Sequence, residues 1–263
     1  MKKIFLILAL VISLVLAEKA IGFSEDEQKI IDTRVEKIQE DIDTKWENYR
    51  DFYLYLLDEE KQNTKDEKQK EIIDAIREKI QKVQEIESPT NLEEYHIDTK
   101  KILEIWLNWQ NTVRWELKLT PYSYDSLLNN SALTWSQLSA KKSYIDHKRT
   151  LWDTYYNYKK IESWMKWEGV VCKNISRKTF SESIGYGSFS CNDEDCTDEL
   201  ISWIKSTFNF FMSEKGKKHS PHYNAIVSPY FSTIGTGIEL VKTGKNTYKY
   251  YLTSHYCTEL ISN

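Results

Sequence analysis

The sequence predicts an α+β protein in which an α-helical hairpin precedes a mixed domain of helices and a small sheet. Between residues 24 and 90, apolar side chains recur every three or four positions, which is the period of an amphipathic helix. From residue 98 onward the chain becomes rich in Trp and Tyr. Beyond Phe180 the helical period gives way to short segments with Gly and Ser, which end in the β-rich stretch TYKYYLTSHYCTEL. Helices followed by strands favour a single α+β domain in which helices cover a small sheet.

Length and composition restrict the class of protein. The 263 residues suffice for one sizeable domain with an extension, or for two modest domains. Charged residues make up 29% and aromatic residues 13%, which excludes a wholly disordered chain and a multi-pass membrane protein. With a formal net charge of −4 there is no basic excess to neutralise phosphates, so we expect no nucleic-acid partner. Low Gly and Pro beside abundant Lys, Asn and Ile indicates a bacterial, AT-rich genome.

Residues 1–17 have the pattern of a secretory signal peptide. Two lysines precede an apolar run from Ile4 to Leu16, and Ala17 supplies the small residue of a cleavage site. The run is short for a bilayer span, and no cysteine follows it to accept a lipid. We therefore expect a secreted or periplasmic protein, extracytoplasmic after cleavage of the signal peptide. The alternative is an uncleaved N-terminal membrane anchor.

Two amphipathic helices are predicted between residues 24 and 90. The first begins at the capping box SEDE, Ser24–Glu27, and its apolar stripe comprises Ile31, Val35, Ile38, Ile42, Trp46, Tyr49, Tyr53 and Leu56. The second begins at the capping box TKDE, Thr64–Glu67, and ends at SPT, Ser88–Thr90; its stripe comprises Ile73, Ile76, Ile80, Val83 and Ile86. We interpret the pair as a coiled-coil-like antiparallel hairpin. Its stripe seals on itself, on the domain behind it, or on a second copy through self-association.

The four cysteines suggest disulfides, because an exported chain reaches an oxidising compartment. Four cysteines allow three pairings. Cys191 and Cys196 bracket the short polar loop CNDEDC, and their closeness favours a local ring, which leaves Cys172 to pair with Cys257. A four-cysteine zinc site is the alternative, but the spacings lack the tight Cys-x2-Cys pairs of such sites.

Three blocks after residue 98 occur in the order of a known family. The first, Asn111–Arg149, contains Asn-x-x-Arg, a Leu-x-Pro turn and a helix before a terminal histidine. The second is FSESIGYG, Phe180–Gly187, and the third is SPHYNAIVSPYFSTIGTGIE, Ser220–Glu239. Together they resemble the CAP superfamily of cysteine-rich secretory, antigen 5 and pathogenesis-related proteins, in the bacterial type with an SCP-like extracellular domain. The resemblance implies a CAP-type α-β-α sandwich over residues 98–263, with the hairpin outside it.

The resemblance also implies a cleft that gathers two histidines and two acidic residues. The histidine that closes the first block is His147, and the histidine after Ser-Pro in the third block is His222. The Glu of the family's Glu-Asn-Ile element is Glu182, although Ser stands here in place of Asn. The second acidic residue is Glu214 in FMSE, where Phe211 stands in place of the usual Trp.

These residue types suit a divalent metal. Neutral imidazoles are good zinc ligands, and nearby carboxylates orient the rings or accept a proton. The expected cofactor is therefore a divalent metal such as zinc, with His147 and His222 as its ligands. The chain has no His-Glu-x-x-His motif, and two histidines fall short of the three-ligand catalytic pattern. The leading hypothesis is a non-enzymatic binding module for a small-molecule or lipid-like ligand.

Two other functions stay open at this point. One is a metal-assisted hydrolase of the protease kind, in which Glu182 or Glu214 acts as the base, so the sequence leaves the question of enzymatic activity undecided. The other is a structural envelope protein that assembles through the helical hairpin. One fold of this kind carries many roles, so fold alone does not choose among the three.

Three neighbouring features have simpler interpretations. His219 has no counterpart in the family and is predicted to face solvent. His255 lies on the last predicted strand, where the alternation of side chains leaves it facing either inward or outward. Gly235 and Gly237 are predicted to let backbone segments pack closely or to bend a strand.

Overall fold

The computed structural model describes residues 23–44, 49–82, 96–150, 153–175 and 178–261. The proposed signal peptide, residues 1–17, and the predicted end of the second helix, Ser88–Thr90, lie outside these ranges. Within them, no helix is long and apolar enough to cross a bilayer.

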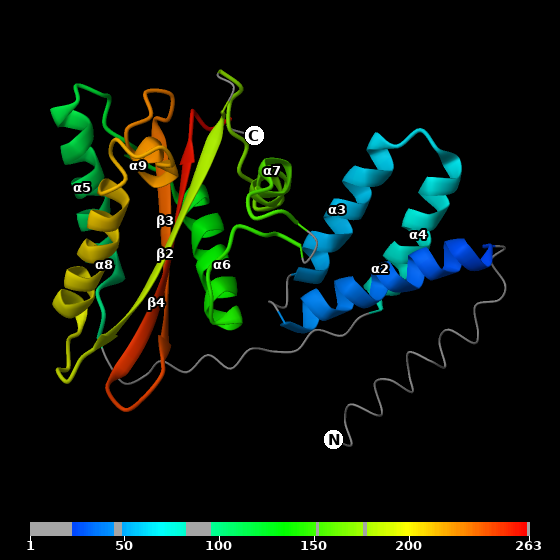
Figure 1. Ribbon diagram of the computed structural model, residues 1–263, viewed down its shortest axis with the longest axis horizontal. Coiled ribbons are helices and arrows are strands. Elements are labelled where there is room, and N and C mark those ends of the chain that lie inside the picture. Colours follow the sequence, from blue (N-terminus) through cyan, green and yellow to red (C-terminus); the bar gives the residue numbers. More distant parts are fainter. Residues whose placement is uncertain (1–22, 45–48, 83–95, 151–152, 176–177, 262–263) are drawn as a thin grey trace.

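A four-stranded sheet forms the centre of the domain, with the spatial order β1-β3-β4-β2 (Figure 1). Strand β1, Ser123–Tyr124, pairs in parallel with β3, Thr233–Lys242. Strand β4, Thr247–Cys257, pairs antiparallel with β3 on one side and with β2, Phe180–Ser190, on the other. Strand β2 is therefore an edge strand, and its outer side borders the loops that carry the candidate site.

Helices cover both faces of the sheet (Figure 1). One face carries α5 (Thr99–Glu116), α8 (Thr197–Met212) and the short α9 (Pro221–Ile226). The other face carries α6 (Ser126–Lys142), and α7 (Tyr158–Trp167) lies beyond it. The predicted α+β class is confirmed, and the three layers agree with the sandwich that the resemblance implies.

Helix α6 approaches the sheet unusually closely because two glycines of β3 lie beneath it. A Cβ atom on Gly235 would lie 2.1 Å from the backbone N of Asn129, and one on Gly237 would lie 2.1 Å from the backbone of Leu133. Real Cβ atoms do not approach backbone atoms so closely, so only glycine permits this packing. The predicted role of these glycines in close backbone packing is confirmed.

The N-terminal helical unit comprises three helices: α2 (Glu25–Thr44), α3 (Tyr49–Asn63) and α4 (Glu67–Gln81). The two-helix hairpin is wrong in this respect, because its first helix is two elements. Arg34 of α2 donates a 3.0 Å hydrogen bond to Glu60 of α3, whereas a straight helix would hold residues 26 apart at roughly 39 Å. The apolar period continues from α2 into α3 because both helices face the same core, so periodicity did not reveal the change of direction.

The caps of these helices agree with the sequence in one case and differ in the other. Ser24 and Glu27 form the predicted capping box, with Glu27 Oε2 accepting from Ser24 N at 2.7 Å. Helix α4 is instead capped by Asp66, whose side chain accepts from the backbone N–H groups of Lys68 and Gln69. Thr64 lies two residues before this cap, and its Oγ1 accepts instead from the backbone N–H of Asp66 at 3.3 Å.

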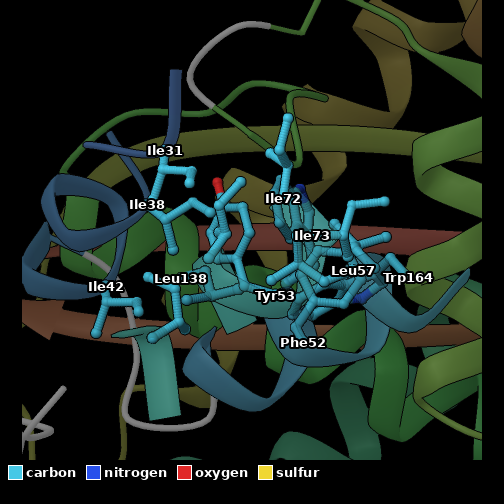
Figure 2. Packing of buried hydrophobic residues seen from close by; sticks show 14 of the residues in the cluster. Ile31, Ile38, Ile42, Phe52, Tyr53, Leu57, Ile72, Ile73, Leu138 and Trp164 are labelled. Atoms are coloured by element: carbon cyan, nitrogen blue, oxygen red, sulfur yellow. The ribbon is translucent and has the colours of Figure 1, made fainter. Parts of the chain in front are cut away.

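The helical unit buries its apolar side chains against the domain rather than leaving them exposed. Ile38, Ile73 and Ile76 are fully buried, in one cluster with Leu138 of α6 and Trp164 of α7. Figure 2 shows this cluster, in which the isoleucines of the unit surround aromatic residues of α3. The stripe thus seals on itself and on the domain behind it, which are two of the three expected alternatives.

Both predicted disulfides are present. Cys191 pairs with Cys196 across the short loop, and Cys172 pairs with Cys257 at the end of β4. The second disulfide ties the segment after α7 to the centre of the sheet. The four-cysteine zinc site is therefore excluded.

Candidate functional site

His147 and Glu182, two of the four predicted site residues, form a histidine–carboxylate pair. Helix α6 ends at Lys142, and the left-handed conformation of its C-cap residue, Ser143, turns the chain into the loop that carries His147. Glu182 lies near the start of the edge strand β2. His147 Nδ1 is 2.7 Å from Glu182 Oε1, and both side chains are buried. Because an ionised carboxylate only accepts hydrogen bonds, His147 Nδ1 carries the proton.

Glu182 has two further partners, and both of its oxygens are engaged. The guanidinium of Arg149 reaches both oxygens, with Nη1 3.2 Å from Oε1 and Nη2 bonded to Oε2. His255 Nε2 lies 2.8 Å from Oε2, because the register of β2 and β4 places His255 directly opposite Glu182. On its other side, His255 Nδ1 lies 2.7 Å from Ser131 Oγ of α6. This network crosses from the loop after α6, through the sheet, to α6 itself.

The surroundings of Glu182 keep it ionised although it is buried. Burial raises the pKa of a carboxyl group, but the charge of Arg149 and the hydrogen bonds from His147 and His255 outweigh that effect. The pKa of Glu182 is therefore held well below its usual range. Burial lowers the pKa of His255, and the hydrogen bond to Glu182 opposes this shift only in part.

Glu214 and His222 form the second pair, on the helical layer of α8 and α9. Glu214 follows the end of α8, and His222 lies in the first turn of α9. His222 Nδ1 is 2.7 Å from Glu214 Oε1, and Glu214 Oε2 accepts from the backbone N–H groups of His222 and Tyr223 at 2.9 and 3.2 Å. These N–H groups belong to the first turn of α9, where no intrahelical carbonyl can accept from them, so Glu214 caps the helix while it orients the ring.

Phe211 packs against one face of the His222 ring. The two rings are stacked with centroids 4.2 Å apart and planes 3° from parallel. Phe211 itself is buried, so the histidine packs on a fixed surface. Ring stacking and the contacts of Glu214 together leave His222 one orientation.

The two pairs lie within electrostatic range of each other. The pKa of His222 is lowered, and burial is the largest cause. The hydrogen bond and charge of Glu214 oppose this lowering, whereas positive charge on His147 and His219 contributes to it. His222 is therefore neutral at lower pH than an exposed histidine. We refer to His147, Glu182, Glu214 and His222 together as the His–Glu site.

Aromatic side chains flank the His–Glu site on both sides. The ring centroids of Tyr155 and Tyr156 lie 5.3 and 4.8 Å from that of His147, and Tyr156 Oη accepts from Glu182 N at 3.3 Å. Burial raises the pKa of Tyr156 to about 12, so its phenol stays neutral. On the other side, Phe210 lies 6.1 Å from His222. Tyr155 and Phe210 are 63% and 58% exposed, so the site has an apolar border that faces solvent.

The two imidazoles have the same state of hydrogen bonding. Each directs Nδ1 to a carboxylate, and within the described part of the chain neither Nε2 atom has a hydrogen-bond partner. A neutral imidazole with Nδ1–H has its lone pair on Nε2. Among the described residues, no group of three or more His, Cys, Asp or Glu side chains is arranged to hold a metal ion. Any metal bound by both Nε2 atoms would keep positions for water or a ligand.

The structure places the predicted site residues in pairs: His147 with Glu182, and Glu214 with His222. His219, three residues before His222, is exposed, as expected. Sequence reasoning missed Arg149 as a site residue and left the direction of His255 open. A signal existed for each, because Arg149 follows His147 by two residues and His255 belongs to a strand that pairs with β2. An open surface hollow along α2, between Asp26 and Lys37, contains none of these residues.

Comparison with known proteins agrees with this architecture. The family model of the cysteine-rich secretory protein family, CAP, matches residues 107–256. No curated protein sequence matches the chain.

Three solved structures are among those similar to the chain. An outer surface protein from Borrelia burgdorferi is 16% identical, with a TM-score of 0.40, over 61% of this chain and 96% of that one. A cysteine-rich secretory protein from Staphylococcus aureus is 12% identical, with a TM-score of 0.32, over 66% of this chain and 42% of that one. An extracellular protein with an SCP domain from Bacillus anthracis is 12% identical, with a TM-score of 0.34, over 66% of this chain and 45% of that one.

Proposed function

The chain belongs to the CAP family of cysteine-rich secretory proteins, and from that premise we propose that it is an extracytoplasmic binding module whose His–Glu site holds a divalent metal. One observation carries the proposal. His147 and His222 each bond through Nδ1 to a buried carboxylate, at 2.7 Å in both cases, which leaves the lone pair of Nε2 available to a metal. This is the arrangement that orients histidine ligands in metal sites, where the second ring nitrogen donates to a carboxylate.

Zinc is the metal that this donor set suits best. Imidazole nitrogen is a common zinc ligand, whereas calcium and magnesium prefer oxygen. The lowered pKa of His222, caused mainly by burial, favours the neutral ring that a metal needs. Glu182 and Glu214 would orient the rings and raise their basicity, and water or a ligand would take the remaining positions.

The border of the site supports a second element of the proposal, a small-molecule or lipid-like ligand. Tyr155 and Phe210 are mostly exposed beside the two imidazoles. Exposed aromatic side chains next to polar groups are typical of sites that bind a ligand with both an apolar and a polar part. The signal-peptide pattern of residues 1–17 supports export, after which such a ligand would be met outside the cytoplasm.

The other two functions have less support. A hydrolase of the usual zinc type uses three protein ligands and an open position, whereas the proposed metal has two imidazoles. Assembly through the helical unit would need an apolar face for a second copy, but the stripe residues Ile38, Ile73 and Ile76 are buried within one chain. The binding module therefore accounts for more of the observed contacts than either alternative.

Calorimetric titration of zinc into the metal-stripped mature protein tests the proposal. We expect one equivalent to bind the wild type, and binding to be lost in the double variant His147→Gln, His222→Gln. His219→Gln is the matched control, because His219 is exposed and close in sequence but has no carboxylate partner in the site; it should bind as the wild type does. Calcium should not bind comparably.

Two outcomes would contradict the proposal. If the wild type binds no zinc, the protein has no zinc site. If zinc still binds after the double substitution, the zinc site lies elsewhere in the protein. The hydrolase alternative would instead require product in excess of one equivalent per protein, with turnover abolished by the same double substitution.

A further inference from the structure

Arg149 occupies a fully buried position beneath the His–Glu site. Its Nη1 donates to Glu182 Oε1 and to the carbonyl O of His147, both at 3.2 Å, and its Nη2 donates to Glu182 Oε2. One guanidinium therefore holds both the carboxylate that orients His147 and the backbone of His147 itself. The planar fork of arginine matches the two oxygens of a carboxylate, which a lysine ammonium group cannot do.

The guanidinium packs against two aromatic rings that also contact each other. Its Cζ lies 3.5 Å from the ring centroid of Trp135 of α6 and 5.5 Å from that of Trp164 of α7. The two tryptophans meet edge to face, with centroids 5.3 Å apart. Because Arg149 is fully buried, it cannot rearrange without displacing these rings.

The N-terminal helical unit packs against the tryptophans that contact Arg149. Phe52 of α3 packs edge to face on Trp164, with centroids 4.7 Å apart, and lies tilted against Trp167 at 5.3 Å. Figure 2 shows Phe52 beside Trp164 within the shared cluster. Ser163 of α7 adds a polar contact, donating to Glu59 of α3 at 2.7 Å. Contacts thus run without a gap from α3 through Trp164 and Arg149 to Glu182 and His147.

We propose that Arg149 is the positioning residue of the His–Glu site, and that the helical unit supports it through Phe52 and Trp164. Arg149 is a cation without a lone pair to offer, so it would not be a ligand of the metal itself. It acts by fixing Glu182, which fixes the Nδ1–H form of His147 and the direction of its Nε2 atom. The consequence for zinc affinity rests on the proposed function, whereas the effect on the state of His147 holds in metal-free protein.

The first test combines two readouts on full-length mature protein. Arg149→Lys keeps the buried charge and so protects the fold, but loses the fork; Arg149→Met removes the charge as well. We expect the zinc Kd to rise about 10- to 100-fold in Arg149→Met, the range found when supporting residues of metal sites are changed, and less in Arg149→Lys. Without metal, ¹⁵N NMR should show a single Nδ1–H tautomer of His147 in the wild type and a mixture in both variants.

Epistasis separates positioning from a general loss of stability. If Arg149 acts through Glu182, adding Arg149→Met to Glu182→Gln should change the zinc Kd by less than about twofold beyond Glu182→Gln alone, because coupled residues are not additive. Fully additive effects, or a His147 tautomer that stays unchanged in both Arg149 variants, would overturn the proposal. If the wild type binds no zinc but the Arg149 variants change the tautomer of His147, the proposed metal site is refuted and the positioning role of Arg149 stands.

The second test addresses the helical unit and leaves the site untouched. Phe52→Leu should raise the zinc Kd roughly three- to tenfold, in the range of coupling through packed side chains, and should populate the second tautomer of His147. Ile76→Val is the matched control, because Ile76 is buried in the same cluster but lies on α4. Equal behaviour of Phe52→Leu and Ile76→Val in both readouts would overturn the role of the helical unit.

Discussion

His255 Nε2 lies 2.8 Å from Oε2 of Glu182, directly across the register of β4 and β2. The contact is made inside the sheet, where neither side chain is exposed. The other ring nitrogen of His255, Nδ1, contacts Ser131 of α6. His255 therefore connects α6 to Glu182 on the edge strand β2. A residue that sequence alternation could place on either face is therefore an internal support of the site.

The position of His255 should tolerate an amide but not an apolar side chain. Gln can donate to Glu182 and accept from Ser131, whereas Leu would remove one hydrogen bond from each of these buried groups, leaving Glu182 with Arg149 and His147, and Ser131 with the carbonyl O of Leu128. We expect His255→Leu to lower the free energy of unfolding by about 1–3 kcal/mol more than His255→Gln. Urea unfolding of the two variants measures the difference, and equal midpoints would show that the contacts of His255 contribute no stability.

Glu168 gives the protein a pH dependence of defined sign. Burial raises its pKa to about 7, against smaller opposing effects of Thr134 and Arg149. Between the unfolded pKa near 4.5 and the folded value, the folded state binds the extra proton, so stability falls as pH rises through that window. Relative to Glu168→Gln, the wild type should lose about 2 kcal/mol of unfolding free energy between about pH 5 and pH 8. Parallel pH profiles of the two proteins would contradict this.

Because α6 packs closely on β3, one added methyl group at the contact should strongly lower the stability of the protein. Gly235→Ala would force a Cβ against the backbone of Asn129, which cannot move alone. We expect a loss of about 3 kcal/mol, at the upper end of overpacking costs. Gly244→Ala is the control, because its Cβ would meet only the side chain of Thr247, and it should cost less than about 1 kcal/mol. Thermal unfolding that ranked the two variants in the opposite order would refute the packing argument.

The two disulfides should contribute unequally to stability. Cys172 and Cys257 are 85 residues apart, whereas Cys191 and Cys196 are 5 apart. A disulfide stabilises the fold by restricting the unfolded chain, and this effect grows with the length of the closed loop. The expected stabilisation is about 4.5 kcal/mol for the long loop and about 2 kcal/mol for the short one. Replacing each pair by serines and measuring guanidinium unfolding tests this, with a larger loss for the short loop as the contrary result.

Sequence patterns were sufficient for features that depend on local spacing or on motifs. The α+β class follows from the change of period near Phe180, and the pairing of Cys191 with Cys196 follows from their closeness. His147, Glu182, Glu214 and His222 were chosen by their place in family motifs, and the structure brings them together in two pairs. Phe211 stands where the family motif before Glu214 usually has Trp, and in the structure Phe211 stacks on His222.

Other features depend on where segments distant in sequence meet. Arg149 looks like one more basic residue after a helix until β2 brings Glu182 to it. The division of the first predicted helix into α2 and α3 leaves no trace in the apolar period, because both helices face one core. Capping of α4 by Asp66 instead of Thr64 follows from how far α3 extends, which depends on tertiary packing.

Zinc K-edge X-ray absorption on the protein with one equivalent of zinc tests whether His147 and His222 bind the metal, because it identifies the atoms bound to zinc. We expect two imidazole nitrogens at about 2.0–2.1 Å from the zinc, with oxygen completing the shell. This imidazole signal should be lost in the double variant His147→Gln, His222→Gln and kept in His219→Gln. A shell with one imidazole or none, or one that the double substitution leaves unchanged, would contradict it.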